Sequence, residues 1–322
     1  MKKIIAFVVS LALTVACVAG CSSPQDPASA GKHKIIAAIY PIYDWMSHLT
    51  EGADDLSLSL LADNGTDIHS YQLTADDMMQ IQDCDLFVYI GGESDNWAKD
   101  VADSLQKNGS KAKTVSLMDL MGDKAKEEEH VEGMQEEKEE EEEKELDEHI
   151  WLSLKNARFL CSELTKTLGE VLPDDKSLCE KNAEKYDKAL AAMDEQYTKA
   201  LSEKKRDTLL FGDRFPFRYL TDDYDLKYYA AFAGCSAETE ASFETVAFLA
   251  NKLDELQLPA VITIDNSDQK IAQTIINTSK SGSAKILTLD SMQSMTIDKA
   301  KTEGDYLKIM EKNLEVLQQA LN

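Results

Sequence analysis

The sequence is poor in basic residues. Its 322 residues include 34 lysines and arginines against 59 aspartates and glutamates, which gives a formal net charge of −25 at pH 7. A protein with this excess of carboxylates repels phosphate groups, so nucleic acid and anionic membrane surfaces are not expected partners. A cation is the partner that this charge favours, and the chain is long enough for two ordinary domains.

Motifs typical of metal enzymes are also missing. No two of the four cysteines that follow the N-terminal segment form a CxxC or another metal-type spacing, and no HExxH motif occurs. A catalytic zinc ion needs an open coordination position and a nearby general base, so this absence argues against a zinc hydrolase. The sequence leaves open whether a disulfide forms among the four cysteines that follow the N-terminal segment. These four are Cys84, Cys161, Cys179 and Cys235.

No apolar run is long enough for a stable membrane span, since Ile4–Ala16 is short and follows two lysines. The motif "VAGC" at Val18–Cys21 resembles the lipobox of bacterial lipoproteins, in which the cysteine is diacylated and becomes the new N-terminus. This resemblance implies a signal peptide at 1–20 and lipidation of Cys21; the small residues and prolines of 21–32 indicate a flexible tether. We expect an extracytoplasmic protein anchored to the cell membrane by lipid. The alternative is an ordinary signal peptide with an incidental cysteine.

The rest of the chain alternates between apolar strands and amphipathic helices. Short apolar runs at 34–39, 56–61 and 85–91 are separated by helical patterns, which is typical of a parallel α/β sheet. Thr74, followed three residues later by Asp77, indicates the capped start of one of these helices. The same alternation returns in the last third of the chain. The sequence therefore predicts an α/β protein with two lobes.

A long polar helix is predicted between these lobes. Within 174–204 apolar residues recur at intervals of three, four or, less regularly, eight residues, which fits one helix of about 30 residues. A helix of this length between two α/β patterns is expected to act as a rigid strut. The predicted domains are an N-terminal lobe at 33–172, a linking helix at 173–205 and a C-terminal lobe at 206–322.

A dense acidic run lies in the predicted loop 124–147. Glu127–Glu145 holds twelve glutamates against two lysines, a local charge near −10, and His149 follows it closely. Such a run repels itself and stays solvated, so one interpretation is a surface loop without chemistry. The other interpretation is a loop that attracts cations to a site that includes His149.

Four segments together resemble the metal-specific solute-binding lipoproteins of zinc and manganese ABC importers. The resemblance implies two α/β lobes with parallel sheets, joined by one long rigid helix, with the metal site in the cleft between the lobes. It also implies a binding protein and not an enzyme. The segments are "IIAAIYPIYDWMSHLTEG" at Ile35–Gly52, "DIHSYQLTADDMMQIQDCDLFVYIGG" at Asp67–Gly92, "DEHIWLSLKNA" at Asp147–Ala157 and "VITIDNSDQKIAQTI" at Val261–Ile275.

The resemblance also implies a set of metal ligands. The family's first two ligands are histidines, and the matching positions are His69 in "DIHSY" and His149 in "HIWL". The third is usually a His or Glu just after the strand that opens the second lobe. Here Gly212 stands at about that place and Asp213 follows it. A shift of one residue would bring in Asp213, or the site could use water in its place.

The fourth ligand of the family is a carboxylate after a later strand of the second lobe. "VITIDNSDQK" offers Asp265 at the strand end, with Asp268 as a rival. Asp265 is favoured because α/β proteins place ligand groups at strand ends that face a cleft. Two imidazoles and two carboxylates suit Zn²⁺, with Mn²⁺ as the alternative ion. An acidic insert is a feature of the family's zinc members, which favours zinc.

The implied function is extracytoplasmic capture of a divalent metal ion, Zn²⁺ before Mn²⁺, by a monomeric protein. The captured ion is then delivered to an ABC-transporter permease in the cytoplasmic membrane. A manganese-specific protein of the same family is the alternative, and a zinc-dependent hydrolase and an adhesin are more distant ones.

Overall fold

The computed structural model describes residues 33–135, 145–236 and 240–322. The predicted signal peptide, Cys21 and the tether lie outside the described residues, as does 136–144 of the acidic run. Within the described ranges, none of the helices combines the length and the apolar character that a membrane crossing requires.

The N-terminal lobe is built on a parallel sheet of four strands. The strands lie in the order β2, β1, β3, β4, and Ile35 of β1 pairs with Leu58 on one side and with Leu86 on the other. All four residues of β3 are buried, as expected for an inner strand of a parallel sheet that is covered on both faces. The strands are β1 (His33–Ala37), β2 (Leu56–Leu60), β3 (Leu86–Tyr89) and β4 (Lys113–Ser116).

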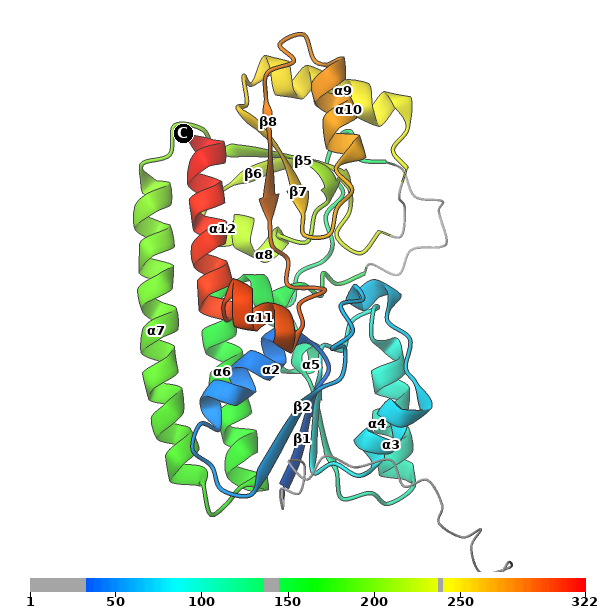
Figure 1. The fold of residues 1–322 in the computed structure, drawn as a ribbon, viewed down its shortest axis with the longest axis vertical. Coiled ribbons are helices and arrows are strands. Elements are labelled where there is room, and N and C mark those ends of the chain that lie inside the picture. Colours follow the sequence, from blue (N-terminus) through cyan, green and yellow to red (C-terminus); the bar gives the residue numbers. More distant parts are fainter. Residues whose placement is uncertain (1–32, 136–144, 237–239) are drawn as a thin grey trace, which may run out of the picture. The chain divides into compact units, whose positions relative to one another are not determined.

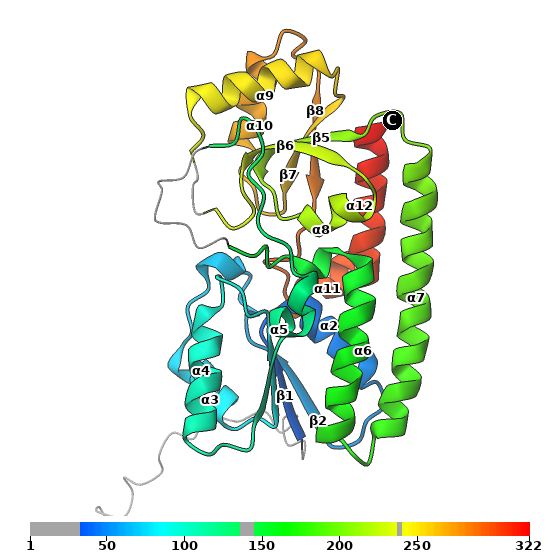
Figure 2. The same ribbon diagram turned by 180° about the vertical axis from the view of Figure 1, so that it is seen from behind.

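Helices cover this sheet on both sides, with α3 and α4 on one side and α2 and α6 on the other (Figures 1 and 2). The predicted helix cap is confirmed: Asp77 N–H donates to Thr74 Oγ1 at 3.2 Å, and Thr74 N–H donates to the Asp77 carboxylate at 2.8 Å. The helical segments are α2 (Tyr40–Leu49), η2 (Ile68–Ser70), α3 (Ala75–Gln82), α4 (Asn96–Lys107), α5 (Leu117–Met121), η3 (Gly122–Lys124), η4 (Ile150–Leu152) and α6 (Leu154–Val171).

The long helix α7 (Lys176–Ser202) contacts both lobes. Asn182 Nδ2 donates to the carbonyls of Leu49 and Glu51 in the N-terminal lobe, at 3.2 and 2.9 Å. Near the other end, Tyr197 Oη donates to the carbonyl of Met310 at 2.6 Å. Its apolar stripe is buried against α6 and α12, which run beside it (Figures 1 and 2). The helix therefore has the strut-like position that its length predicts.

The C-terminal lobe repeats the arrangement. Its four parallel strands lie in the order β6, β5, β7, β8. The strands are β5 (Thr208–Arg214), β6 (Lys227–Phe232), β7 (Ala260–Ile264) and β8 (Lys285–Leu289). The helices are α8 (Arg218–Asp223), α9 (Phe243–Glu255), α10 (Lys270–Thr278), α11 (Ile297–Glu303) and α12 (Tyr306–Leu321). Two α/β lobes with parallel sheets confirm the predicted fold class.

The two lobes share one apolar core. Trp151 is fully buried between them, and its indole Nε1–H donates to the carbonyl of Ser291 in the C-terminal lobe at 2.9 Å. Tyr306 of α12 donates its hydroxyl proton to the carbonyl of Trp151 at 2.7 Å and lies edge-on to the ring of Trp45 in α2. These bonds fix the segments that carry the predicted ligands on either side.

Candidate metal centre

His69 and His149 each follow an aspartate by two residues, and in both places the aspartate forms a tight local turn. Asp67 Oδ1 accepts the backbone N–H of His69 at 3.0 Å, and Asp147 Oδ1 accepts that of His149 at 2.9 Å. An aspartate that binds the backbone two residues ahead is the usual Asx turn. The sequence pattern D-x-H therefore sets the local backbone at both histidines.

Buried apolar residues hold these two turns in place. His69 lies in the short helical turn η2 beside fully buried Ile68. His149 directly precedes η4, whose residues Ile150 and Trp151 are fully buried. Only 12% of the His69 side chain and none of the His149 side chain is exposed. Both imidazole rings are therefore fixed on rigid supports.

The rings meet at their Nε2 atoms, which lie 3.3 Å apart. The far nitrogen of each ring is held: Asp147 Oδ1 accepts from Nδ1–H of His149 at 3.0 Å, and Ser94 Oγ lies 2.9 Å from Nδ1 of His69. A carboxylate on one nitrogen fixes the proton there and leaves a lone pair on the other. Two Zn–N bonds of about 2.0–2.1 Å at the tetrahedral angle hold their nitrogens about 3.3 Å apart. The ring spacing therefore fits one zinc ion.

An acidic residue, Glu148, also lies beside the two histidines and is completely buried. Its Oε2 accepts the backbone N–H of Ser94 at 3.0 Å, and its Oε1 lies 3.7 Å from His69 Nδ1, without a hydrogen-bond partner among the described residues. Gly92 makes the space for it, because a Cβ there would lie 2.0 Å from Oε2. In the described chain, His69, Glu148 and His149 are the three residues whose potential ligand atoms all lie within 4.8 Å of one another.

Of the two acidic neighbours of His149 in the sequence, Asp147 holds His149 and Glu148 turns toward His69. The sequence left open which of the two would orient the ring. Because consecutive side chains at this bend point in different directions, the structure assigns Asp147 to His149.

Gln293 is the residue that sequence reasoning missed. It lies in the loop between β8 and α11, and its Nε2 is 2.7 Å from His69 Nε2 and 2.9 Å from His149 Nε2. Its own Oε1 is buried and has no hydrogen-bond partner in the described part of the chain. A single glutamine in a loop belongs to no periodic pattern or motif, so the sequence could not predict that Gln293 lies at the site.

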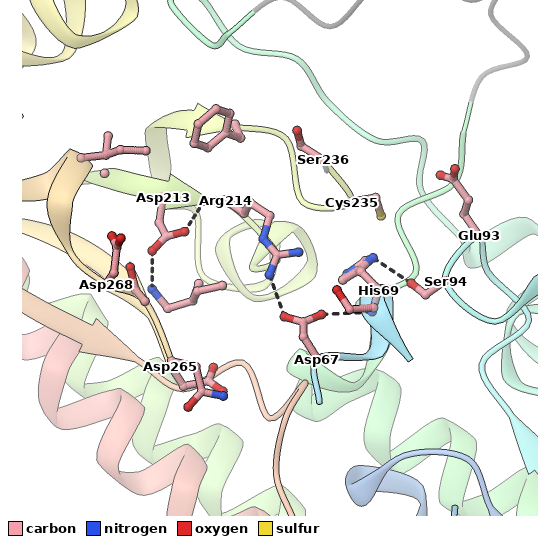
Figure 3. A pocket seen from close by; sticks show the side chains of 17 residues that line it. Asp67, His69, Glu93, Ser94, Asp213, Arg214, Cys235, Ser236, Asp265 and Asp268 are labelled. Atoms are coloured by element: carbon pink, nitrogen blue, oxygen red, sulfur yellow. Dashed lines mark hydrogen bonds and ion pairs between the residues drawn. The ribbon is translucent and has the colours of Figure 1, made fainter. Parts of the chain in front are cut away.

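Asp213 lines the same pocket of about 640 Å³ as His69, and Figure 3 shows its carboxylate bonded to backbone groups of its own lobe and not to His69. It accepts the backbone N–H groups of Arg214 at 2.9 Å and Ile264 at 3.4 Å. Gly212 packs against α10, where a Cβ would lie 2.6 Å from Ala272 Cα, so this position has no room for a ligand side chain.

Asp265 lines this pocket as well and holds the loop that carries Gln293. Its carboxylate accepts from Ser291 N–H at 2.7 Å, from Ser291 Oγ at 2.6 Å and from Ser294 Oγ at 2.9 Å. The rival residue Asp268 is exposed and pairs with Lys270. Neither Asp265 nor Asp268 belongs to the group that His69, Glu148 and His149 form. Ligation by Asp213 and Asp265 stays a prediction.

Arg214 crosses from the C-terminal lobe to the turn of His69. Its Nη2 donates to Asp67 Oδ2 at 2.7 Å, as Figure 3 shows. Burial is the largest single effect and would raise the pKa of Asp67, but the Arg214 guanidinium and His69, with their charges and hydrogen bonds together, lower that pKa. The ion pair therefore ties the end of β5 to the first histidine.

The protonation of the site suits a cation. Burial, followed by the neighbouring His149 ring, lowers the pKa of His69 to about 3, so this imidazole is neutral at pH 7. Burial is the largest single effect on His149 and opposes its charged form, but the charge and hydrogen bond of Asp147, together with Glu148 and Glu128, raise the pKa of that ring. Burial raises the pKa of Glu148 to about 7. The neutral His69 ring can bind a divalent ion directly, whereas an ion that binds His149 must displace any proton from its Nε2. The buried carboxyl groups beside both rings favour a cation.

Comparisons with known proteins place these features in a family context. Residues 35–320 match the family model of ZnuA, described as the periplasmic component A of a zinc-uptake complex. The chain is 32% identical to the zinc-binding lipoprotein AdcA of Streptococcus pneumoniae, over 99% of this chain and 61% of that protein. It is 27% identical to the high-affinity zinc uptake system protein ZnuA of Bacillus subtilis, over 98% of this chain and 96% of that protein.

Solved structures agree with this similarity. The Zn(II)-bound AdcA of Streptococcus pneumoniae has a TM-score of 0.72 at 29% identity, with 90% of this chain and 58% of that chain covered. The Zn(II)-bound ZnuA-like domain of the same protein has a TM-score of 0.70 at 28% identity, with 90% and 99% covered. The chain thus spans about three fifths of the length of the AdcA proteins and nearly all of the ZnuA-like domain.

Proposed function

The chain belongs to the ZnuA family of zinc-uptake components, and from this premise we propose that it captures one Zn²⁺ ion outside the cytoplasm and delivers it to an ABC permease. Relatives named zinc-binding proteins and structures described as Zn(II)-bound support zinc as the cargo. The family is that of a component of an uptake complex and not of an enzyme, which agrees with the predicted binding protein and not with a hydrolase.

One observation carries the proposal. The Nε2 atoms of His69 and His149 lie 3.3 Å apart on rings whose other nitrogens are held by Asp147 and Ser94. Such a pair is arranged in advance for an ion that prefers nitrogen donors and tetrahedral geometry, which describes zinc better than manganese. Manganese favours sites with a larger share of oxygen donors.

The proposed ligands are His69 and His149, with oxygen donors that complete the coordination. Glu148 is the carboxyl group nearest to the pair, and Asp213 and Asp265 line the adjoining pocket. The lobes that carry them correspond to the proposed domains at 33–172 and 206–322, joined by the linking helix at 173–205. For Asp213 to ligate, its oxygens would have to exchange their present backbone N–H partners for the ion.

We also propose that the protein is a monomer held at the membrane by lipid on Cys21. Relatives carry the name lipoprotein, and the family is described as periplasmic, which places the chain outside the cytoplasm. A signal peptide at 1–20 and a tether at 21–32 complete this proposal. Tethering would keep a cargo protein close to its permease and raise the local concentration of each for the other.

The proposal is tested by zinc titration of the wild-type protein and of His69→Ala and His149→Ala. We expect one tight site per chain in the wild type and affinity weaker by about tenfold or more in each variant, because each loses half of the imidazole pair. His33→Ala, which removes a histidine at the start of β1 that pairs with Asp85, is the matched control and should bind zinc normally. A variant with an unchanged titration curve would remove that histidine from the site.

A further inference from the structure

We propose that Glu148 is the positioning residue of His69: its buried carboxylate keeps the proton of this ring on Nδ1, so that the lone pair of Nε2 is free for the ion. This inference rests on the proposed function and deepens it. It places Glu148 behind a ligand ring and not among the groups that bind the ion.

The first step concerns the proton of His69. An imidazole binds a metal ion through one nitrogen only when its proton sits on the other. For His149, the Asp147 carboxylate can only accept and lies 3.0 Å from Nδ1, so the proton stays there. The partner of His69 Nδ1 is the Ser94 hydroxyl at 2.9 Å, which can donate as readily as accept (Figure 3). The Gln293 amide beside Nε2 can likewise present its N–H groups or its oxygen, so neither partner fixes the proton of His69.

The second step identifies the group that does fix this proton. Glu148 Oε1 lies 3.7 Å from Nδ1 of His69, on a side chain with no exposed surface, and has no hydrogen-bond partner among the described residues. Buried acceptors are nearly always satisfied, so an unsatisfied one beside a site points to a functional role. A carboxylate in a buried place attracts a ring N–H and repels a ring lone pair. It therefore favours the proton of His69 on Nδ1, the nitrogen that it faces.

The third step is that the fold holds this carboxylate in place. Glu148 Oε2 accepts the backbone N–H of Ser94 at 3.0 Å, so one carboxylate lies against both the ring of His69 and the loop that carries the hydroxyl partner of that ring. Gly92 in the same loop leaves the necessary space, because a Cβ there would lie 2.0 Å from Oε2 and 2.5 Å from Glu148 Cβ.

The position of Glu148 in the chain also connects the two histidines. Asp147, Glu148 and His149 are consecutive, so one short segment supplies a ligand ring and a carboxylate for each of the two rings. A divalent ion bound to both Nε2 atoms would then have one buried carboxylate behind each ring. Such outer carboxylates orient a ligand and raise its basicity, and their loss typically costs about 10–100-fold in metal affinity.

The test compares Glu148→Gln and Glu148→Asp with the wild type by zinc competition titration. Glu148→Gln keeps the shape and an acceptor for Ser94 N–H but loses the charge, so zinc affinity should fall by about tenfold or more. Glu148→Asp keeps the charge on a shorter side chain and should bind zinc more tightly than Glu148→Gln does. A role in packing alone would give the opposite order. Glu163→Gln, which removes a carboxylate of α6 that pairs with Lys166, is the matched control and should bind zinc as the wild type does.

A second readout follows the proton of His69 itself. Long-range ¹H–¹⁵N NMR of the metal-free protein at one fixed pH reports which ring nitrogen carries the proton, with the signals assigned by comparison with His69→Ala. The wild type should show the proton on Nδ1, and Glu148→Gln should show a mixture of the two tautomers. The visible spectrum of the Co²⁺-loaded protein should be the same in both, because no group that binds the ion has changed.

An unchanged zinc affinity or an unchanged His69 tautomer in Glu148→Gln would show that the inference is wrong. A changed Co²⁺ spectrum in this variant would also overturn it, because Glu148 would then bind the ion directly. If the wild type binds no zinc, the proposed function fails, whereas the tautomer of His69 in the metal-free protein still tests the role of Glu148. The two failures are therefore distinguishable.

Discussion

At the scale of single residues, short-range sequence patterns specify the histidines better than they specify the oxygen donors. Each histidine sits two residues after an aspartate, and the Asx turn that results depends on neighbours in the chain. Both histidines could therefore be found from motifs. Gln293 could not, because it reaches the site only through the folding of β8 and the loop that follows it. The direction of Asp213 depends on its contact with β7, which the sequence also leaves unspecified.

Asp265→Ala is expected to lower zinc affinity less than the loss of a histidine does. The carboxylate accepts three hydrogen bonds from Ser291 and Ser294, so its removal loosens the loop of Gln293 and costs about 1–3 kcal/mol of unfolding free energy. Zinc titration together with thermal unfolding measures both effects. Asp268→Ala is the control, since Asp268 is exposed and pairs with Lys270. If Asp268→Ala carries the loss in its place, the ligand position lies three residues further along.

At the scale of elements, regular helices and strands follow from the sequence, whereas the short turns do not. The predicted helix at 174–204 corresponds to α7 at Lys176–Ser202, because its apolar stripe persists over many turns. The turns η2 and η4, which carry or adjoin the two histidines, are three residues each. A segment of three residues is too short to show a helical periodicity of apolar residues. The site therefore lies in the segments that sequence patterns describe least.

The contact between α2, α7 and α12 holds a buried carboxyl group, which gives a prediction for stability. Asp44 accepts from the hydroxyls of Tyr40 at 3.2 Å and Tyr186 at 3.3 Å, and His48 Nε2 lies 3.6 Å from it. Burial is the main cause that raises the pKa of Asp44 to about 6, although His48 acts to lower it; the neighbouring Asp305 raises it further. The folded protein thus binds a proton here that the unfolded chain releases near pH 4.

Because the folded pKa is raised, Asp44 destabilises the protein increasingly as pH rises from about 4 to about 6. The limit is about 3 kcal/mol, from the pKa shift of about two units. In Asp44→Asn this loss is absent, so the difference in unfolding free energy, variant minus wild type, should grow with pH across this window. Urea unfolding at several pH values measures it. Asp103→Asn, which removes an exposed carboxylate of α4, is the matched control. A difference for Asp44→Asn that does not change with pH would contradict the raised pKa.

At the scale of the whole molecule, repeated α/β patterns predicted two lobes, but not how the lobes meet. Their junction depends on bonds between distant residues, such as Arg214 with Asp67 and Trp151 with Ser291. The backbone hydrogen bonds between the two ends of the acidic run are a further contact between residues that are apart in the sequence. Glu128 N–H donates to the carbonyl of Glu145 at 2.9 Å, and Asp147 N–H donates to that of Lys126 at 2.9 Å.

These backbone bonds bring the two ends of the acidic run together just before His149. Some of its glutamates also have structural partners: Glu128 accepts the N–H of Cys235 at 2.8 Å, and Glu129 pairs with Arg218 and Tyr228. The described ends are thus part of the C-terminal lobe surface. A test of the electrostatic role should therefore leave them intact and change only 136–144.

Replacing 136–144 by an uncharged linker of equal length is expected to slow zinc capture while leaving the tight site unchanged. The segment carries seven glutamates and two lysines, so the replacement removes a net charge of −5 from the run that precedes His149 in the sequence. Such a field raises the on-rate of a divalent cation by about tenfold or more, and salt screens it over about 8 Å at physiological ionic strength. Carboxylates on a long loop should bind ions weakly and add nothing to the single tight site.

A second variant, in which the seven glutamates are changed to glutamine, keeps the rest of the segment and should show the same slower capture. Stopped-flow binding at low and high salt decides the question: equal low-salt on-rates in all three proteins would leave the run as a solvated surface loop without a role in capture.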